Sequence, residues 1–481
     1  MDVMDNYRLG LCLPELYLLA VIALLFIQCL TRSEELETGG KSVQWVPFLA
    51  LGGVVVSLFS LGFEGTLFWK AYKIDGLSQL FKLAISVGFF ITTLNAVRPP
   101  ALEKEKRPDY AMFLGLSAFG LMLLSSAVEM ITIYVALEVA SYSLYALIPL
   151  RSNDKRAAEG GIKYIMFGAV ATAIALYGYS YVLAAAHTGY IADLTAVDWS
   201  WAASPMAVMG LTLFLCGMFF KLALFPFHFW CPDVYEGTGN ETAAFVATLP
   251  KLGAVVVLVR FAAFLKPGLE LTTIIAVFGA ISMTLGNLAA LAQKDLKRLL
   301  GYSSVAHAGY VTIGLVAGTA EGLAAASFYI IVYLLMNLTC FWVISRISDD
   351  GRNITLDDLH GLYKKEPVMA FVLAVAAFAL VGLPPTAGFI GKFFLLTSAW
   401  NHGYNWLVII AVLNTAIAIY YYLSMVRHAY TVEDQDAEFK AEVSTSGLIW
   451  GGILAAMLLV LGAVPGPVFD LAAKAGAVLL P

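Results

Sequence analysis

Charged residues are scarce in this 481-residue chain. Asp, Glu, Lys and Arg make up 13% of the residues, whereas hydrophobic residues make up 60%. A soluble domain usually carries about 25% charged residues. The composition therefore predicts a polytopic membrane protein. The formal net charge is only −5, and no basic cluster indicates a nucleic-acid partner.

Cysteine is equally rare, and its spacing indicates no cofactor site. The five cysteines form no CxxC pair, which argues against an iron–sulfur or structural zinc site. The sequence also lacks a Walker A motif and a glycine-rich dinucleotide motif. We therefore expect the chain to bind no cofactor, to carry no redox centre and to hydrolyse no nucleotide.

Long apolar segments dominate what remains. About 20 apolar residues suffice to cross a bilayer as a helix. The sequence predicts an all-α polytopic membrane protein with about 14 spans; thirteen is the next best count, because the boundary between the fourth and fifth is weak. The first span lacks a strongly basic N-terminal region and a convincing cleavage site, so we expect it to be retained. The expected spans cover residues 11–30, 45–63, 75–97, 109–127, 129–150, 160–186, 205–228, 241–265, 270–293, 300–318, 322–346, 368–397, 404–427 and 446–466.

Lysine and arginine are unevenly distributed between the loops. They gather in loops that follow odd-numbered spans, including 98–108, 151–156, 293–298 and 346–365. The positive-inside rule places these loops in the cytoplasm, and hence both termini outside it. One of these loops, 346–367, is polar enough to hold a short surface helix.

The seventh and twelfth spans contain residues that interrupt helices. Pro226 follows Lys221 in the seventh span, and Pro384 and Pro385 precede Lys392 in the twelfth. Proline removes a helix hydrogen bond and clashes with the preceding turn, so we expect both helices to be discontinuous. Because the two are five spans apart, they run in opposite directions, as in inverted repeats.

The repeat defines the expected division of the chain. We expect an N-terminal three-helix segment, two antiporter-like five-helix repeats (spans 4–8 and 9–13) and a C-terminal helix. These parts cover residues 1–108, 109–265, 270–430 and 431–481.

Three lysines lie deep inside predicted spans. Lys221 and Lys392 lie beside the expected breaks, and Lys251 directly follows Pro250. A charged side chain at mid-membrane costs about 2.5–3.5 kcal/mol on insertion scales, and such residues usually mark ion or proton pathways. The three lysines therefore predict a path for a proton or another cation.

Three further residues are candidates for the same path. Glu138 lies near mid-span, where it either tunes a lysine across a helix interface or forms a structural hydrogen bond. His307, with serines at 303 and 304, is either a proton relay or a satisfied core histidine. Lys163 opens the sixth span and either faces the path or extends to the surface.

Other charged residues are expected near the ends of spans. We expect Lys82 to anchor a span boundary and Arg260 to extend toward the outer surface. Asp233 and Glu236 follow the broken seventh span, where a structural role is favoured over guarding a channel entry.

Three long motifs carry a family resemblance. They are FKLALFPFHFWCPDVYEGTG at 220–239, DLKRLLGYSSVAHAGYVTIGLVAG at 295–318 and GLPPTAGFIGKFF at 382–394. Together they resemble the antiporter-like membrane subunits of respiratory complex I, over about residues 75–430. Within that family, the chain is most similar to the subunit N group of bacterial NADH–quinone oxidoreductase. The twelfth-span lysine, the fifth-span LEVASYSLYAL and the absence of a long lateral helix favour that group.

The resemblance implies a function and a set of path residues. Such a subunit couples NADH-to-quinone electron transfer on other subunits to proton translocation, and is therefore part of a translocase. The family's fifth-span glutamate falls on Glu138, and its lysines on Lys221, Lys251 and Lys392. The full proton path is expected to comprise Glu138, Lys163, Lys221, Lys251, His307 and Lys392.

The resemblance also implies the surroundings of the chain. NADH, FMN, iron–sulfur clusters and quinone are expected on other subunits. The expected partners are a neighbouring antiporter-like subunit, small membrane subunits and the lipid bilayer, and the expected location is a bacterial inner membrane with periplasmic termini. Two alternatives stay open: a subunit of a multi-subunit sodium/proton antiporter, and a membrane scaffold that conducts nothing.

Overall fold

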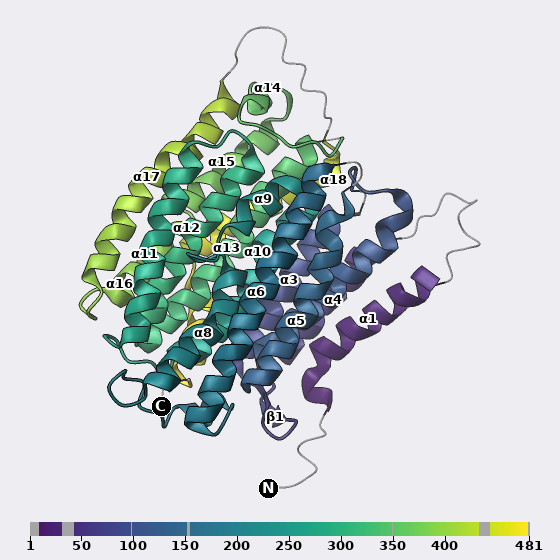
Figure 1. Ribbon diagram of the computed structural model, residues 1–481. Helices are drawn as coiled ribbons and strands as arrows, with labels where there is room; N and C mark the ends of the chain where they lie inside the picture. Colours follow the sequence, from purple (N-terminus) through teal and green to yellow (C-terminus); the bar gives the residue numbers. More distant parts are fainter. Residues whose placement is uncertain are drawn as a thin grey trace.

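The computed structural model describes residues 9–30, 43–97, 99–151, 154–348, 350–431 and 443–479. Within these residues the chain is a bundle of helices with one short β-hairpin (Figure 1). The helices are α1 (Leu13–Leu30), α2 (Val46–Phe59), α3 (Gly76–Asn95), α4 (Arg107–Ser126), α5 (Met130–Leu147), α6 (Lys155–Ala186), α7 (Ile191–Leu194), α8 (Pro205–Leu222), α9 (Trp230–Gly237), α10 (Asn240–Ala262), α11 (Glu270–Leu291), α12 (Leu296–Val316), α13 (Ala320–Ile347), α14 (Leu362–Lys365), α15 (Pro367–Val381), α16 (Ala387–Ala399), α17 (Asn405–Tyr430), α18 (Thr445–Ala463) and α19 (Gly466–Ala477).

Twelve of the described helices are long and apolar enough to cross a membrane. Shorter apolar helices cover Val46–Gly62, Pro367–Val381 and Ala387–Ala399. The all-helical membrane fold is thereby confirmed, while the count of fourteen spans stays a prediction. The weak boundary between the fourth and fifth spans is a true break, because residues 127–129 form backbone bridges with Tyr72 and Tyr190. The two chain ends, residues 1–8 and 480–481, lie outside the described residues.

Two helices occupy the centre of the bundle. Every residue of α10 is buried, and so is nearly all of α13. A helix that is apolar on all sides is buried on all sides, and both helices follow that rule. By contrast α1, α6, α17 and α18 expose large apolar side chains along one face, which suits a surface in contact with lipid or another membrane subunit.

The predicted discontinuities are present at both places. After α8, Ala223 adopts a left-handed conformation with φ of 60°, and α9 begins only at Trp230. After α15, Gly382 adopts φ of 89°, and α16 begins at Ala387. Glycine adopts a left-handed conformation without a Cβ penalty, which explains its place directly after α15. The expected surface helix of the 346–367 loop is also present, as α14.

The N-terminal part holds a hairpin that the sequence did not predict. Strands β1 (Gly65–Leu67) and β2 (Tyr72–Ile74) pair antiparallel in the connection between α2 and α3, with Gly65 opposite Ile74. The prediction of spans does not detect this hairpin, because a 20-residue hydropathy window averages over its two three-residue strands.

Two expectations about boundary residues are wrong. Lys82 is completely buried on α3, and its Nζ lies 2.6 Å from Oε1 of Glu15 on α1. Arg260 is also buried and forms two hydrogen bonds of 2.9 Å to the carboxylate of Asp75. Both cations are retained inside the protein because a carboxylate from another part of the chain compensates each one.

Candidate functional site

Lys221 lies in the last turn of α8 and is 2% exposed. Its Nζ donates a hydrogen bond of 2.8 Å to the hydroxyl oxygen of Tyr164 on α6. The same ammonium lies over the rings of Tyr164 and Phe220, 5.1 and 5.8 Å from their centroids. A hydroxyl and two aromatic faces therefore compensate the buried charge.

Glu138 does not contact Lys221 directly. It is 7% exposed on α5, and its Oε1 accepts a hydrogen bond of 2.5 Å from Thr172 on α6. No ion pair of the described residues joins Glu138 to Lys221. Both instead bond to α6, at Thr172 and Tyr164, which are eight residues or about 12 Å apart along the helix. The tuning of Lys221 by Glu138 stays a prediction, to be transmitted through α6.

Lys163 lies at the edge of the site. Its side chain is 36% exposed, and its Nζ lies 2.5 Å from Asp233 and 2.7 Å from Glu159. Arg298 completes the cluster with contacts of 2.6 Å to Asp233 and 2.7 Å to Glu236. The cluster ties α9 to α6 and α12, which agrees with the structural role favoured for the carboxylates after the broken span.

The ion pairs lower the pKa of Asp233. Burial would raise the pKa of this carboxyl, but hydrogen bonds from Lys163 and Arg298 outweigh it and hold the pKa below its usual range. Asp233 is therefore ionised at neutral pH, as an anchor for two cations should be.

Lys251 lies in a group of hydroxyls at the centre of the bundle. Its Nζ donates to both the Oγ and the backbone oxygen of Ser304 on α12. The Ser304 hydroxyl is also 2.5 Å from the Tyr333 hydroxyl and 3.1 Å from that of Tyr235. A row of hydroxyls with rotatable protons can both donate and accept, which is what proton transfer requires.

His307 continues this group along α12. It is 3% exposed; its Nδ1 lies 2.6 Å from the Tyr329 hydroxyl and its Nε2 3.1 Å from that of Tyr422. The Tyr422 hydroxyl is also hydrogen-bonded to Ser303. With a hydroxyl at each ring nitrogen, His307 can take up a proton on one side and release it on the other.

Lys392 lies on α16, just past the second break. Its Nζ donates hydrogen bonds of 3.2 and 2.9 Å to the backbone oxygens of Leu380 and Val381. These carbonyls belong to the last turn of α15, where a helix has no partner for them and where its dipole favours a cation. The ammonium also lies over the Tyr310 ring, 4.4 Å from its centroid.

The candidate residues form a row with two gaps at which an aromatic side chain stands between successive stations. Hydrogen bonds through Ser304 join Lys251 to Tyr333. The step from Tyr333 to His307 is a ring contact of 5.2 Å, with no hydrogen bond among the described residues. Between Lys221 and Lys251 stands Trp230, whose ring contacts those of Tyr164 and Tyr235. An indole only donates a hydrogen bond, so the row is interrupted there.

The second gap lies between His307 and Lys392. The ring of Tyr310 stands 6.0 Å from the His307 ring, with Lys392 over its face. The Tyr310 hydroxyl bonds instead to Ala411 O and the Thr415 hydroxyl. An aromatic ring therefore separates successive stations at both gaps.

Several residues of this row were missed by the sequence reasoning. Tyr164 directly follows Lys163, and only the lysine drew attention. Tyr329 and Tyr333 are four residues apart on α13, and so face the same side. That spacing is a usable signal, although tyrosines of an apolar helix often pack without such a role. The missed partners are Tyr164, Thr172, Tyr235, Tyr329, Tyr333 and Tyr422.

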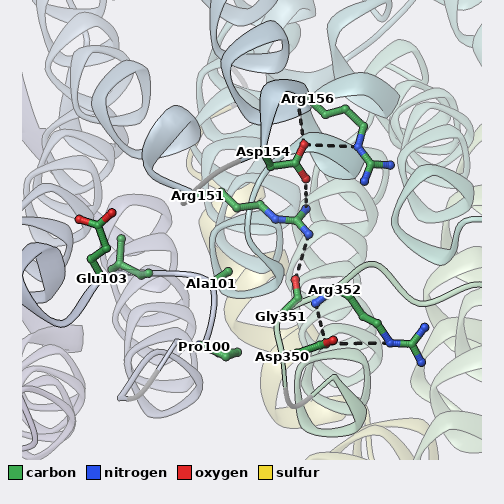
Figure 2. Close-up of a pocket in the computed structure, with 10 residues that line it drawn as sticks. Pro100, Ala101, Glu103, Arg151, Asp154, Arg156, Asp350, Gly351 and Arg352 are labelled. Atoms are coloured by element: carbon green, nitrogen blue, oxygen red, sulfur yellow. Dashed lines mark hydrogen bonds and ion pairs between the residues drawn. The ribbon is translucent and has the colours of Figure 1, made fainter.

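A surface cavity of about 580 Å³ lies apart from this row, between the 99–103 segment, the start of α6 and the 350–352 segment (Figure 2). Arg151 there pairs with Asp154 and donates to the Gly351 carbonyl. Arg352 pairs with Asp358. The arginines face acidic partners, and no predicted path residue lines the cavity, so we assign it a structural role.

Comparison with known proteins agrees with this geometry. Residues 127–418 match the family model described as NADH:quinone oxidoreductase/Mrp antiporter, TM. The chain is 60% identical over 470 residues to NADH-quinone oxidoreductase subunit N 2 of Solidesulfovibrio magneticus, covering 98% of this chain and 99% of that one. It is 42% identical to the subunit N 2 of Opitutus terrae, over 95% and 96% of the two chains.

Solved structures show the same fold. A chain of respiratory complex I from Thermus thermophilus matches with a TM-score of 0.80 and 32% identity, over 95% of this chain and 99% of that one. A chain of the Mrp complex from Dietzia sp. matches with a TM-score of 0.85 over 99% and 98%, but with only 18% identity. That second likeness shows the fold alone.

Interrupted helices with buried lysines beside them, together with the family match, define the chain as an antiporter-like membrane subunit. The sequence identities are specific enough to go further. The chain belongs to the NADH-quinone oxidoreductase subunit N family.

Proposed function

We propose that this chain translocates protons as the subunit N of a membrane arm, coupled to NADH–quinone electron transfer on other subunits. The observation that carries the proposal is the row from Lys221 through Lys251 and His307 to Lys392. Each member is buried. Lys221, Lys251 and His307 bond to hydroxyls that can pass a proton, whereas Lys392 is held by two backbone carbonyls. A scaffold would gain nothing from four buried ionisable groups that cost free energy to insert.

The path starts at the first break. A proton from the cytoplasm reaches Lys221 past the ion-paired cluster of Lys163 and Asp233. The proton then crosses to the set of hydroxyls around Lys251 once water bridges the gap at Trp230. From there it passes His307, crosses at the Tyr310 ring to Lys392, and leaves on the periplasmic side.

The control of the path rests on Glu138. A negative charge two turns along α6 from Tyr164 favours the protonated form of Lys221 without touching it. A change of charge in the neighbouring subunit would alter that balance and release the proton. This role makes Glu138 a regulatory residue rather than a station.

The two five-helix repeats remain the proposed division of the core. One packing detail supports them. A Cβ on Gly120 of α4 would lie 2.5 Å from the Ala140 nitrogen of α5, and a Cβ on Gly286 of α11 would lie 2.6 Å from the Ala306 nitrogen of α12. The first two helices of each proposed repeat thus approach through the same glycine–alanine contact.

The remaining assignments follow from the family. We place the chain in a bacterial inner membrane with both termini on the periplasmic side, against an antiporter-like neighbour and small membrane subunits. NADH, FMN, iron–sulfur clusters and quinone belong to those other subunits, and this chain contributes no redox centre.

The proposal is tested by Lys221→Ala in the assembled complex. NADH-driven proton translocation into vesicles should fall about tenfold or more, because a transfer group of the path is lost. The matched control is Lys364→Ala, which removes an exposed lysine of α14 and should change nothing. A normal proton-to-electron ratio in Lys221→Ala contradicts the proposal. Sodium transport independent of NADH would instead identify a sodium/proton antiporter.

A further inference from the structure

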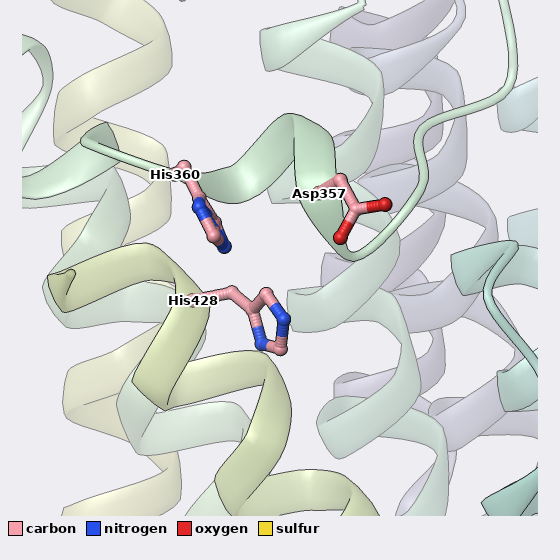
Figure 3. Close-up of side chains that lie close together, drawn as sticks. All are labelled: Asp357, His360 and His428. Atoms are coloured by element: carbon pink, nitrogen blue, oxygen red, sulfur yellow. The ribbon is translucent and has the colours of Figure 1, made fainter. Parts of the chain in front are cut away.

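A second group of ionisable side chains lies outside the proton path. Asp357 opens the short 3-10 helix Asp357–Leu359, His360 follows it, and His428 lies in the last turn of α17. One candidate ligand atom from each side chain lies within 4.8 Å of the other two. Figure 3 shows the two imidazoles close together, with the Asp357 carboxylate beside them. The ring centroids of His360 and His428 are 4.7 Å apart.

The hydrogen bonding of His428 prepares it to bind a metal. Its Nδ1 lies 2.6 Å from the backbone oxygen of Ser424, one turn earlier on α17. A carbonyl only accepts, so Nδ1 carries the proton, and the lone pair of the neutral ring is on Nε2. A histidine that donates one ring N–H to a backbone carbonyl is the usual arrangement of a metal ligand.

The adjacent residues Asp357 and Asp358 differ in their hydrogen bonds. Asp358 accepts hydrogen bonds of 2.8 and 2.6 Å from the backbone and hydroxyl of Thr355, and lies 3.0 Å from Arg352. Asp357 has no hydrogen bond or ion pair to its carboxylate within the described part of the chain. The loop thus employs one aspartate in its own folding and leaves the other available.

The backbone fixes the two halves of the group relative to each other. The Gly361 nitrogen donates a hydrogen bond of 2.9 Å to the Thr431 oxygen, just beyond α17. This bond joins the α13–α15 connection to the end of α17. Its donor directly follows His360, and its acceptor lies three residues after His428. The donors therefore do not depend on a chance approach of two mobile segments.

We propose that Asp357, His360 and His428 bind a divalent transition-metal ion of the zinc class. Two imidazoles and one carboxylate suit Zn²⁺, whereas Mg²⁺ and Ca²⁺ prefer oxygen ligands throughout. In a tetrahedral site with bonds of about 2.1 Å, the ligand atoms are about 3.4 Å apart. Side-chain rotations that move each donor atom by about 1 Å therefore bring these three atoms to that spacing. Water takes the fourth position.

The site is separate from the proton path but shares a helix with it. Tyr422, which bonds to His307, precedes His428 by six residues, or about 9 Å along α17. A bound ion fastens the end of this helix to the α13–α15 connection. The site therefore adds a cross-link to the Gly361–Thr431 hydrogen bond and the Tyr363–Tyr430 ring stack.

Zinc binding to the assembled complex tests the proposal. The complex is treated with chelator, equilibrated with Zn²⁺, washed and analysed for metal content. The wild type should retain one zinc more than His360→Ala and His428→Ala. Asp357→Asn should bind that zinc about tenfold or more weakly, since even loss of a second-shell partner costs that much. The matched control is His402→Ala, an exposed histidine whose Nδ1 bonds to the Trp400 oxygen.

Two outcomes overturn the proposal. The first is equal zinc in the wild type and in both histidine variants. The second outcome applies if the variants fail to assemble, and it is read from zinc X-ray absorption of the reloaded wild type. This spectrum should show imidazole scattering that the chelated sample lacks. Reloaded zinc without imidazole ligands excludes this site.

Discussion

The two interrupted helices hold their lysines in different ways. Lys221 precedes its break and donates to a side chain, the Tyr164 hydroxyl. Lys392 follows its break and donates to two backbone carbonyls at the end of α15. Residue type and burial are the same, but one charge is solvated by a neighbouring helix and the other by the broken helix itself.

The difference arises from how each helix ends. At α8, the Phe220 oxygen accepts from the Trp230 indole and from the Ala223 nitrogen. The Phe220 oxygen is therefore satisfied without Lys221. At α15, the Leu380 and Val381 oxygens turn to Lys392. At α15 the break thus supplies a cation site from last-turn carbonyls that Lys392 occupies.

The largest expected effect comes from Lys221→Arg and Lys392→Arg. Arginine keeps the charge but does not release its proton. We expect NADH-driven proton translocation to fall about tenfold or more in both variants, since each lysine must exchange a proton. The assembled Lys364→Arg complex serves as control. Full activity in Lys392→Arg would reduce that lysine to a fixed charge and leave Lys221 as the exchanging group.

A smaller effect is expected on stability, where Lys392→Met and Lys221→Met should differ. Lys392→Met leaves two buried carbonyls without a donor, at about 1–3 kcal/mol for an unsatisfied group. Lys221→Met leaves one buried hydroxyl instead of two carbonyls without a partner, so we expect a smaller loss. The measurement is the thermal inactivation midpoint of the assembled complex for both variants. Equal losses would show that the carbonyls at α15 contribute nothing specific.

The smallest effect concerns pH and the ion pairs beside the first break. The pKa of Asp233 is lower in the folded protein than its ordinary value, so its contribution is present above about pH 4 and fades as pH falls further. Its partners are partly exposed, which limits that contribution to less than about 1 kcal/mol. Asp233→Asn should lower the thermal midpoint at pH 7 and reduce the further loss on acidification.

Asp470→Asn, which changes an exposed carboxylate near the C-terminal end, is the control for this series. Among the described residues no ion pair involves α15 or α16, so the second break should show no such acid dependence. An unchanged acid response in Asp233→Asn would mean that the Lys163–Asp233–Arg298 cluster does not stabilise α9.

Sequence reasoning was strongest where a single residue type carried the signal. The apolar spans, both breaks and the burial of Lys221, Lys251 and Lys392 were predicted, because prolines and lysines are conspicuous in apolar segments. The partners of those lysines were not. Tyr164 gives no sign in the sequence that its hydroxyl meets a lysine 57 residues away.

The errors have the same origin. Lys82 and Arg260 were placed at span boundaries because nothing local compensates their charge. Their partners, Glu15 and Asp75, lie 67 and 185 residues away in the chain. Which turn of α6 Glu138 would bond to was likewise not predictable: it bonds to Thr172, and Lys221 bonds to Tyr164. Pairings between distant helices depend on tertiary packing, which no single-sequence pattern records.

The complete burial of α10 constrains how the protein is made. Outside the bundle, this helix would bring Pro250 and Lys251 into lipid, and the lysine alone would cost about 2.5–3.5 kcal/mol at mid-membrane. Inside it, α10 is surrounded by α3, α4, α12 and α13 and keeps no face for lipid. Because α12 and α13 follow it in the chain, α10 cannot reach its final surroundings until both are synthesised. The enclosure of the helix that carries Lys251 therefore waits until α13 ends at Ile347.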